Sequence, residues 1–209
     1  NMNREPNVSY YLQAHRFNEG PGFTCHSVYH LLPPEKHFKD HPDFYSMIDG
    51  KRIAPTEFDW RDVHMTPSLL RQVGQLCMTN PATIEALTKA ILDQIDKAPS
   101  NKWPHISQMD WENWCTCDTC AAIDAREESH IGATLFGINQ IAENVEKARP
   151  GYGIETLAYT FTRKPPKCMK PRPNVAIKLC SIECDFSRPL SDPNSELNRK
   201  FAGDIEKWS

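Results

Sequence analysis

The spacing of the hydrophobic positions changes near Leu76. From that point on, apolar residues recur at helical spacing in two long stretches. The first stretch begins at Asn80-Pro81, a pair suited to the N-cap and first position of a helix. The two apolar stripes, which predict two amphipathic helices, are Ile84, Leu87, Ile91 and Ile95, then Leu135, Ile138, Ala142 and Val145.

Short apolar runs predict β-strands at residues 105–109, 154–160 and 175–180. The last run is nearly continuous in apolar residues, as expected of a parallel strand buried on both faces. A proline-rich loop, 164–173, separates the last two strands, and a terminal helix is predicted from about Ser195. Strands that alternate with amphipathic helices imply parallel strands joined by crossover connections.

The first 75 residues are less regular. Extended runs are predicted at 8–14 and 24–30, and residues 44–48 predict a hairpin that turns at Asp49-Gly50, a pair that accepts positive φ. Residues 51–75 are predicted to form a long loop, and long ordered loops are often functional. We expect residues 1–209 to form a single domain with an irregular part, 1–75, and an alternating part, 76–209.

These patterns predict an α/β fold, namely part of a (β/α)8 TIM-type barrel with parallel strands, truncated at both ends. A complete barrel takes about 250 residues, whereas the chain has 209. Asn1 precedes the first methionine and the last helical stripe stops at Ser209, so both ends are interpreted as cut. The alternative is an open doubly wound sheet. No Gly-x-Gly-x-x-Gly follows a strand, and no organic cofactor is expected.

Composition and charge argue against two kinds of partner, nucleic acid and the membrane. The formal net charge of −3 gives no reason to expect nucleic acid. No apolar run approaches the roughly 18 residues that a membrane-spanning helix needs, so we expect no membrane insertion.

The most compact group of reactive side chains is Cys115-x-Cys117-x-x-Cys120. Three thiolates this close can wrap one Zn²⁺, and thiolate-rich zinc sites are usually structural. The sequence leaves the fourth ligand open among Cys77, Cys184, His26, His30 and His130. The alternative is one disulfide plus a free thiol, which would suit an exported protein with eight cysteines.

Polar side chains follow each predicted strand, where parallel α/β folds gather their functional groups. Asp110 follows the first strand, Tyr159 and Arg163 the second, and Glu183 and Asp185 the third. Asp110 and Glu183 could form the pair of carboxyl groups that glycoside hydrolysis requires. The plain alternative is that these acids cap helices or pair with Arg163 and Lys164.

Aromatic and histidine side chains near the same strand ends could contact a sugar. Aromatic rings could stack on the apolar faces of sugar rings; the candidates are Trp111, Trp114, Tyr159 and Phe161. His26 and His30 would share one face of the strand predicted at 24–30 and could bind sugar hydroxyls or a metal. Two partly buried, hydrogen-bonding histidines are the alternative.

Several motifs resemble those of one uncharacterised family. They are His26-Ser-Val-Tyr-His30, Gln75-Leu-Cys77, Ser107-Gln108-Met-Asp110, Cys115-Thr-Cys117-Asp-Thr-Cys120, Ala158-Tyr159-Thr-Phe-Thr-Arg163 and Cys180-Ser-Ile-Glu183-Cys184-Asp185. The chain is similar to a domain-of-unknown-function family of glycoside-hydrolase-like TIM barrels from bacterial polysaccharide-utilisation proteins, in α-glucuronidase-like or hexosaminidase-like contexts.

The resemblance implies a glycoside hydrolase fragment that cleaves a complex polysaccharide with two carboxylates, Asp110 and Glu183. By the same analogy, contact with the substrate is expected from His26, His30, Tyr159, Arg163, Trp111 and Asp185. A non-catalytic carbohydrate-binding barrel and a zinc-stabilised scaffold are the alternatives. The expected location is the periplasm, the cell surface or the medium, with other domains of a longer protein as partners.

Overall fold

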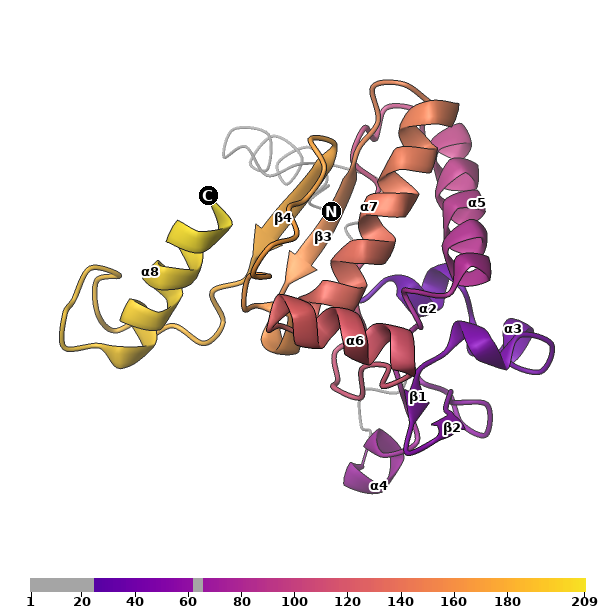
Figure 1. Cartoon of the computed structure of the whole chain (residues 1–209), viewed down its shortest axis with the longest axis horizontal. Helices are drawn as coiled ribbons and strands as arrows, with labels where there is room; N and C mark the ends of the chain where they lie inside the picture. The colour runs from indigo at the N-terminus through magenta and orange to yellow at the C-terminus, as the bar shows by residue number, and fades with distance from the viewer. Residues whose placement is uncertain (1–24, 62–65) are drawn as a thin grey trace, which may run out of the picture.

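The computed structural model describes residues 25–61 and 66–209. Helices α5 (Pro81–Lys97) and α7 (Ile131–Ala148) lie side by side, and the ten-residue α6 (Asp118–Glu127) crosses the lower end of α7 (Figure 1). Strands β3 (Ile154–Ala158) and β4 (Val175–Leu179) lie on the side of α7 away from α5. Helix α8 (Glu196–Trp208) lies beyond β4, at the edge of the molecule.

Shorter elements make up the rest of the described chain. They are α2 (Val28–Leu31), α3 (Pro34–His37), η1 (Pro42–Phe44), β1 (Met47–Ile48), β2 (Lys51–Arg52), α4 (Pro67–Leu70) and η2 (Thr160–Thr162). None of the helices in the described ranges is long and apolar enough to cross a bilayer.

The two helices predicted from the apolar stripes are confirmed. Helix α5 begins where its cap predicts, because the Asn80 Oδ1 accepts a hydrogen bond from the Ala82 N–H at 2.9 Å and Pro81 fills the first position. Every residue of both stripes is buried, and the two helices pack against each other to form the centre of the core.

Helix α7 approaches the segment before α5 so closely that only glycine fits at the contact. A Cβ added at Gly137 would lie 2.3 Å from the carbonyl oxygen of Met78 and 3.0 Å from its Cβ. The backbone of Cys77, Met78 and Thr79 is therefore held directly against α7.

The hairpin predicted at Asp49-Gly50 is confirmed. Both turn residues have positive φ, 49° and 74°, as a two-residue type I′ turn requires. The paired strands are shorter than predicted, since only Met47↔Arg52 and Ile48↔Lys51 pair and Phe44 belongs to η1.

The predicted parallel strand pairing is also confirmed. Strands β3 and β4 pair in parallel from Ile154↔Val175 to Ala158↔Leu179. On the other side of β3, the segment around His105 forms a parallel bridge to Glu155, and the Ile106 N–H donates to the Glu155 carbonyl at 2.9 Å. Three parallel segments therefore end at one edge, which we call the carboxyl edge.

The predicted TIM-type barrel is wrong. The described residues form two separate two-stranded sheets, β1–β2 and β3–β4, and no closed barrel. The connection from β3 to β4 contains η2 and an irregular proline-rich loop where a barrel needs a crossover helix. The parallel pattern in the sequence was real, but it extends over too few strands to close.

The extended run predicted at 24–30 is wrong over the residues that the structure describes. Val28–Leu31 is a helical turn, and His26 has a left-handed backbone with φ of 61°. His26 and His30 therefore do not share the face of a strand. The extended run predicted at 8–14 lies outside the described residues.

Helix α6 has no counterpart in the prediction because its buried face is polar. The buried residues are Cys120, Asp124 and Glu127, at spacings of four and three, which place them on one face of a helix. Glu127 accepts the N–H groups of Cys168 and Met169, each at 2.8 Å, so its carboxylate anchors a loop. A search for apolar stripes cannot find such a helix.

The close approach of α7 gives a direct test. Gly137→Ala should lower the free energy of unfolding by about 1–3 kcal/mol, because the added methyl group meets a backbone carbonyl that cannot move away cheaply. The matched control is Gly203→Ala in α8, where an added Cβ meets nothing within 4 Å. That variant should be neutral or more stable by up to about 1 kcal/mol. Equal urea midpoints for both variants would contradict this account of the packing.

Candidate metal centre and functional site

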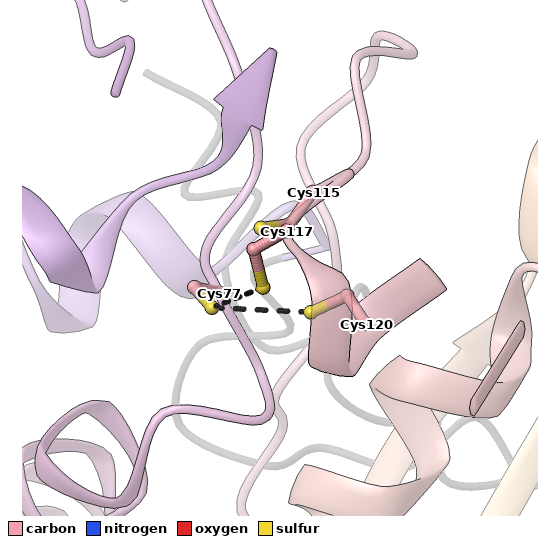
Figure 2. Close-up of side chains that lie close together, drawn as sticks. All are labelled: Cys77, Cys115, Cys117 and Cys120. Atoms are coloured by element: carbon pink, nitrogen blue, oxygen red, sulfur yellow. Dashed lines mark hydrogen bonds between the residues drawn. The ribbon is translucent and has the colours of Figure 1, made fainter. Parts of the chain in front are cut away.

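Four cysteines from two distant parts of the chain come together at the start of α6 (Figure 2). Cys77 lies just before α5, and the others belong to the Cys115-x-Cys117-x-x-Cys120 motif. Cys117 is the N-cap residue of α6 and Cys120 lies in its first turn. Cys77 is thus the fourth member of the group, one of the five candidates that the sequence left open.

The geometry of the four sulfurs matches a metal site. All four Sγ atoms lie within 4.8 Å of one another, and the Cys77 Sγ lies 3.7 Å from that of Cys117 and 3.8 Å from that of Cys120. A zinc tetrahedron with Zn–S bonds of about 2.3 Å has S···S edges of about 3.8 Å. A disulfide would need about 2.05 Å, and all eight cysteines are unbridged. The four cysteines could therefore hold a metal ion.

Neighbouring groups donate toward the sulfurs. The Met47 N–H donates to the Cys115 Sγ at 3.3 Å, and the Arg52 guanidinium lies 3.7 Å from the same atom. The Thr79 hydroxyl lies 3.1 Å from the Cys120 Sγ. Such donors orient thiolate ligands, and the Arg52 cation offsets part of the negative charge that four thiolates carry.

The thiols of Cys77 and Cys120 oppose each other's ionisation. The pKa of Cys77 is lowered, because the thiols of Cys115 and Cys120 hydrogen-bond to its sulfur. The pKa of Cys120 is raised, because its ionisation would lose the hydrogen bonds with Cys115 and Cys77 and set two thiolates side by side. A bound dication removes this conflict, and the N-terminus of α6 adds favourable charge at Cys117 and Cys120.

A second group of side chains meets at the carboxyl edge. The Tyr159 hydroxyl donates to Asp110 Oδ1 at 3.0 Å, and His26 Nε2 lies 3.8 Å from the same oxygen. The other ring nitrogen of His26, Nδ1, donates to the Gln108 carbonyl at 2.9 Å and fixes the ring. Burial and the Asp110 carboxylate both raise the pKa of Tyr159. The structure thus brings three predicted site residues, His26, Asp110 and Tyr159, together.

Glu183 and Arg163, also predicted at the site, are engaged with each other. Arg163 forms an ion pair with Glu183, and its Nε donates to Asp204 of α8 at 2.9 Å. The Arg163 carbonyl also accepts from the Trp208 indole N–H at 3.0 Å. Arg163 therefore connects the chain after β3 to α8, and Glu183 is neutralised by a cation.

The remaining predicted residues take other positions. The Trp111 indole N–H donates to the Gly74 carbonyl at 2.7 Å and its ring packs edge-on against Tyr29. His30 packs edge-on against Trp60. Asp185 accepts from the Ser187 N–H and hydroxyl and closes a local turn. In the part of the chain that the structure describes, none of the three forms a hydrogen bond, ion pair or ring contact with Asp110.

Two further residues lie next to the cysteines. His130, one of the five candidates for the fourth ligand, instead places Nδ1 at 3.1 Å from Asp124 Oδ2. Asp124 is buried on α6 and also accepts from the Ala133 N–H at 2.7 Å. Its helical spacing to Cys120 was the only signal in the sequence that could have drawn attention to it.

Fold and site together define a class of protein, a mixed α and β domain in which four cysteines that could hold a metal ion bring the start of a helix next to a distant segment. The chain belongs to the family described as a domain of unknown function (DUF4838), whose profile matches residues 2–209. This confirms the uncharacterised family that the motifs predicted. No curated protein and no solved structure matched the chain.

The contacts of Arg163 give a second test. Arg163→Met should release α8 from the body of the protein, because it removes both ion pairs while keeping an apolar stem. We expect at least tenfold faster cleavage within residues 181–209 by a dilute protease. The control is Lys207→Met, which removes one positive charge from α8 itself. This variant should be cleaved at the wild-type rate. Equal rates in both variants would show that Arg163 does not hold α8.

Proposed function

We propose that this domain binds one structural Zn²⁺ through Cys77, Cys115, Cys117 and Cys120. The observation that carries the proposal is the pair of S···S distances, 3.7 and 3.8 Å, at the spacing of a zinc tetrahedron. Zinc fits better than a hard cation, because all four donors are thiolates. With four protein ligands the coordination shell is closed, which favours a structural role over a catalytic one.

The role of the ion would be to join three segments. Cys77 lies in the segment just before α5, and Cys117 and Cys120 lie at the N-cap and in the first turn of α6. The β1 strand attaches to the same place, because Thr116 donates through its N–H and its hydroxyl to the Met47 carbonyl at 2.8 and 2.7 Å. The cysteine group forms its own small cluster beside the main core. Without the ion, few apolar contacts would therefore hold these segments together.

Metal analysis of the purified protein tests this proposal. We expect about one zinc per chain, and a Cys77→Ser variant should hold less than a tenth of that and unfold at lower temperature. Chelator should lower the melting temperature of the wild type, because metal-binding free energy is also folding free energy. Cys168→Ser, at an exposed cysteine outside the group, is the matched control and should keep both zinc and stability.

A metal-free wild-type protein with full stability would overturn the proposal. So would paired thiols among the four cysteines in a count with a thiol reagent. Retention of zinc by both Cys77→Ser and Cys117→Ser would place the ion elsewhere.

A second candidate function is favoured by the convergence of His26, Asp110 and Tyr159. We propose that the carboxyl edge binds a carbohydrate, with hydroxyl groups of the sugar meeting the Asp110 carboxylate and the free side of His26. Hydrolysis by Asp110 and Glu183 has less support than binding, because Glu183 would first have to leave Arg163. A single carboxyl group with a phenol donor beside it suits recognition of hydroxyl groups.

Titration with plant and host oligosaccharides tests this second proposal. Asp110→Asn and Tyr159→Phe should each weaken binding about tenfold, the value of one lost charge-assisted hydrogen bond. The matched control, Glu112→Gln, removes an exposed acid from the same loop and should bind normally. Unchanged affinity in both test variants would remove the carboxyl edge from consideration. If the wild type released reducing sugar and the Glu183→Gln variant did not, the two-carboxylate mechanism would again be favoured.

A further inference from the structure

Two adjoining cavities are lined by residues of α6, the start of α7 and η2, and Asp110 lines neither of them. The outer cavity has a volume of about 510 Å³ and the inner one about 30 Å³. Both are lined by Trp114, Cys115, Asp124, His130 and Phe161. We call the two together the Trp114 cleft. The outer volume falls in the range of small-molecule sites, roughly 300–1,000 Å³.

The walls of the Trp114 cleft are aromatic and already fixed. The Trp114 ring stacks on the His130 ring with centroids 3.9 Å apart, and Phe161 lies 5.4 Å from Trp114. All three side chains are only half-buried, whereas most large apolar residues of the core are fully buried. Aromatic surface that is held rigid beside a cavity offers contact area at little entropic cost to a ligand.

The polar groups of the outer cavity are positioned by their neighbours. Asp124 holds Nδ1 of His130 and thereby leaves Nε2 facing away from the carboxylate. Lys164 and Glu128 also line the outer cavity, where the Lys164 ammonium donates to the Glu128 carbonyl, and burial raises the pKa of Asp124. Because the carboxyl groups of Asp124 and Glu128 lie in the same wall as the Lys164 ammonium, the cleft does not favour a phosphate or another strong anion.

An unpaired acceptor lies at the inner cavity. Gln108 is 4% exposed and lines this cavity, and its Oε1 has no hydrogen-bond partner among the described residues. The orientation of the amide is fixed, because Nε2 donates to the Tyr159 carbonyl and to the Thr162 hydroxyl at 3.1 and 2.7 Å. A buried acceptor without a partner costs about 1–3 kcal/mol, so the inner cavity has one polar atom in its wall that the protein itself does not satisfy.

We infer that the Trp114 cleft binds a single neutral pyranose ring. Its apolar C–H face would lie on the Trp114 and Phe161 rings, and its hydroxyls would meet His130 Nε2 and the Lys164 ammonium. An exocyclic hydroxyl would enter the inner cavity beside Gln108, since about 30 Å³ admits a group of this size. The choice of a sugar rests on the proposed carbohydrate function, but the cleft is separate from the Asp110 group.

Ligand-observed NMR on the zinc-loaded protein tests the inference, with methyl pyranosides of glucose, galactose, mannose, xylose and N-acetylglucosamine as probes. At least one should receive saturation from the protein. Ala125→Phe should abolish the transfer, because Ala125 is an exposed α6 residue that lines the outer cavity. Trp114→Ala should weaken binding at least tenfold.

The matched control is Ala122→Phe, which adds the same ring to an exposed position of α6 that does not line the cleft. It should bind like the wild type, and so should Asp110→Asn. Binding by none of the five pyranosides, or binding that survives Ala125→Phe, would overturn the inference. Binding lost in Asp110→Asn but kept in Ala125→Phe would place the sugar at the carboxyl edge and support only the earlier carbohydrate proposal.

Discussion

The short segment Cys77-Met78-Thr79 is held on two sides, and much of the structure depends on this constraint. On one side the Met78 carbonyl lies against Gly137 of α7, so closely that no side chain fits between them. On the other side Cys77 and Thr79 contact the sulfurs of Cys117 and Cys120 at the start of α6. The segment therefore fixes α5, α6 and α7 relative to one another before any longer-range packing is considered.

The metal group and the Trp114 cleft share this framework. Cys115 and Cys120 contribute to the zinc candidate and also line the inner cavity, while Asp124, one turn further along α6, orients His130. A bound ion that fixes the first turn of α6 would also fix the aromatic wall. Preorganisation of this kind lowers the entropic cost of binding a ligand.

The residues selected from strand ends divided into two groups for an electrostatic reason. Asp110 keeps an exposed carboxylate and gains a phenol donor from Tyr159, so it remains available to a ligand. Glu183 forms an ion pair with Arg163, which also forms an ion pair with Asp204 of α8. Position at a strand end thus identified where polar groups gather, but it does not indicate which acid a neighbouring cation neutralises.

The sequence by itself determined the two long helices, the Asp49-Gly50 hairpin, the parallel pairing and the cysteine motif, because each follows from local spacing or local backbone preference. Only the tertiary structure decided the choice of Cys77, the polar buried face of α6 and the absence of a closed barrel among the described residues. Cys77 lies 38 residues before Cys115, α6 buries acids whose partners come from distant backbone, and closure depends on how many strands pair. These outcomes are contacts between distant segments, which periodicity along one segment does not encode.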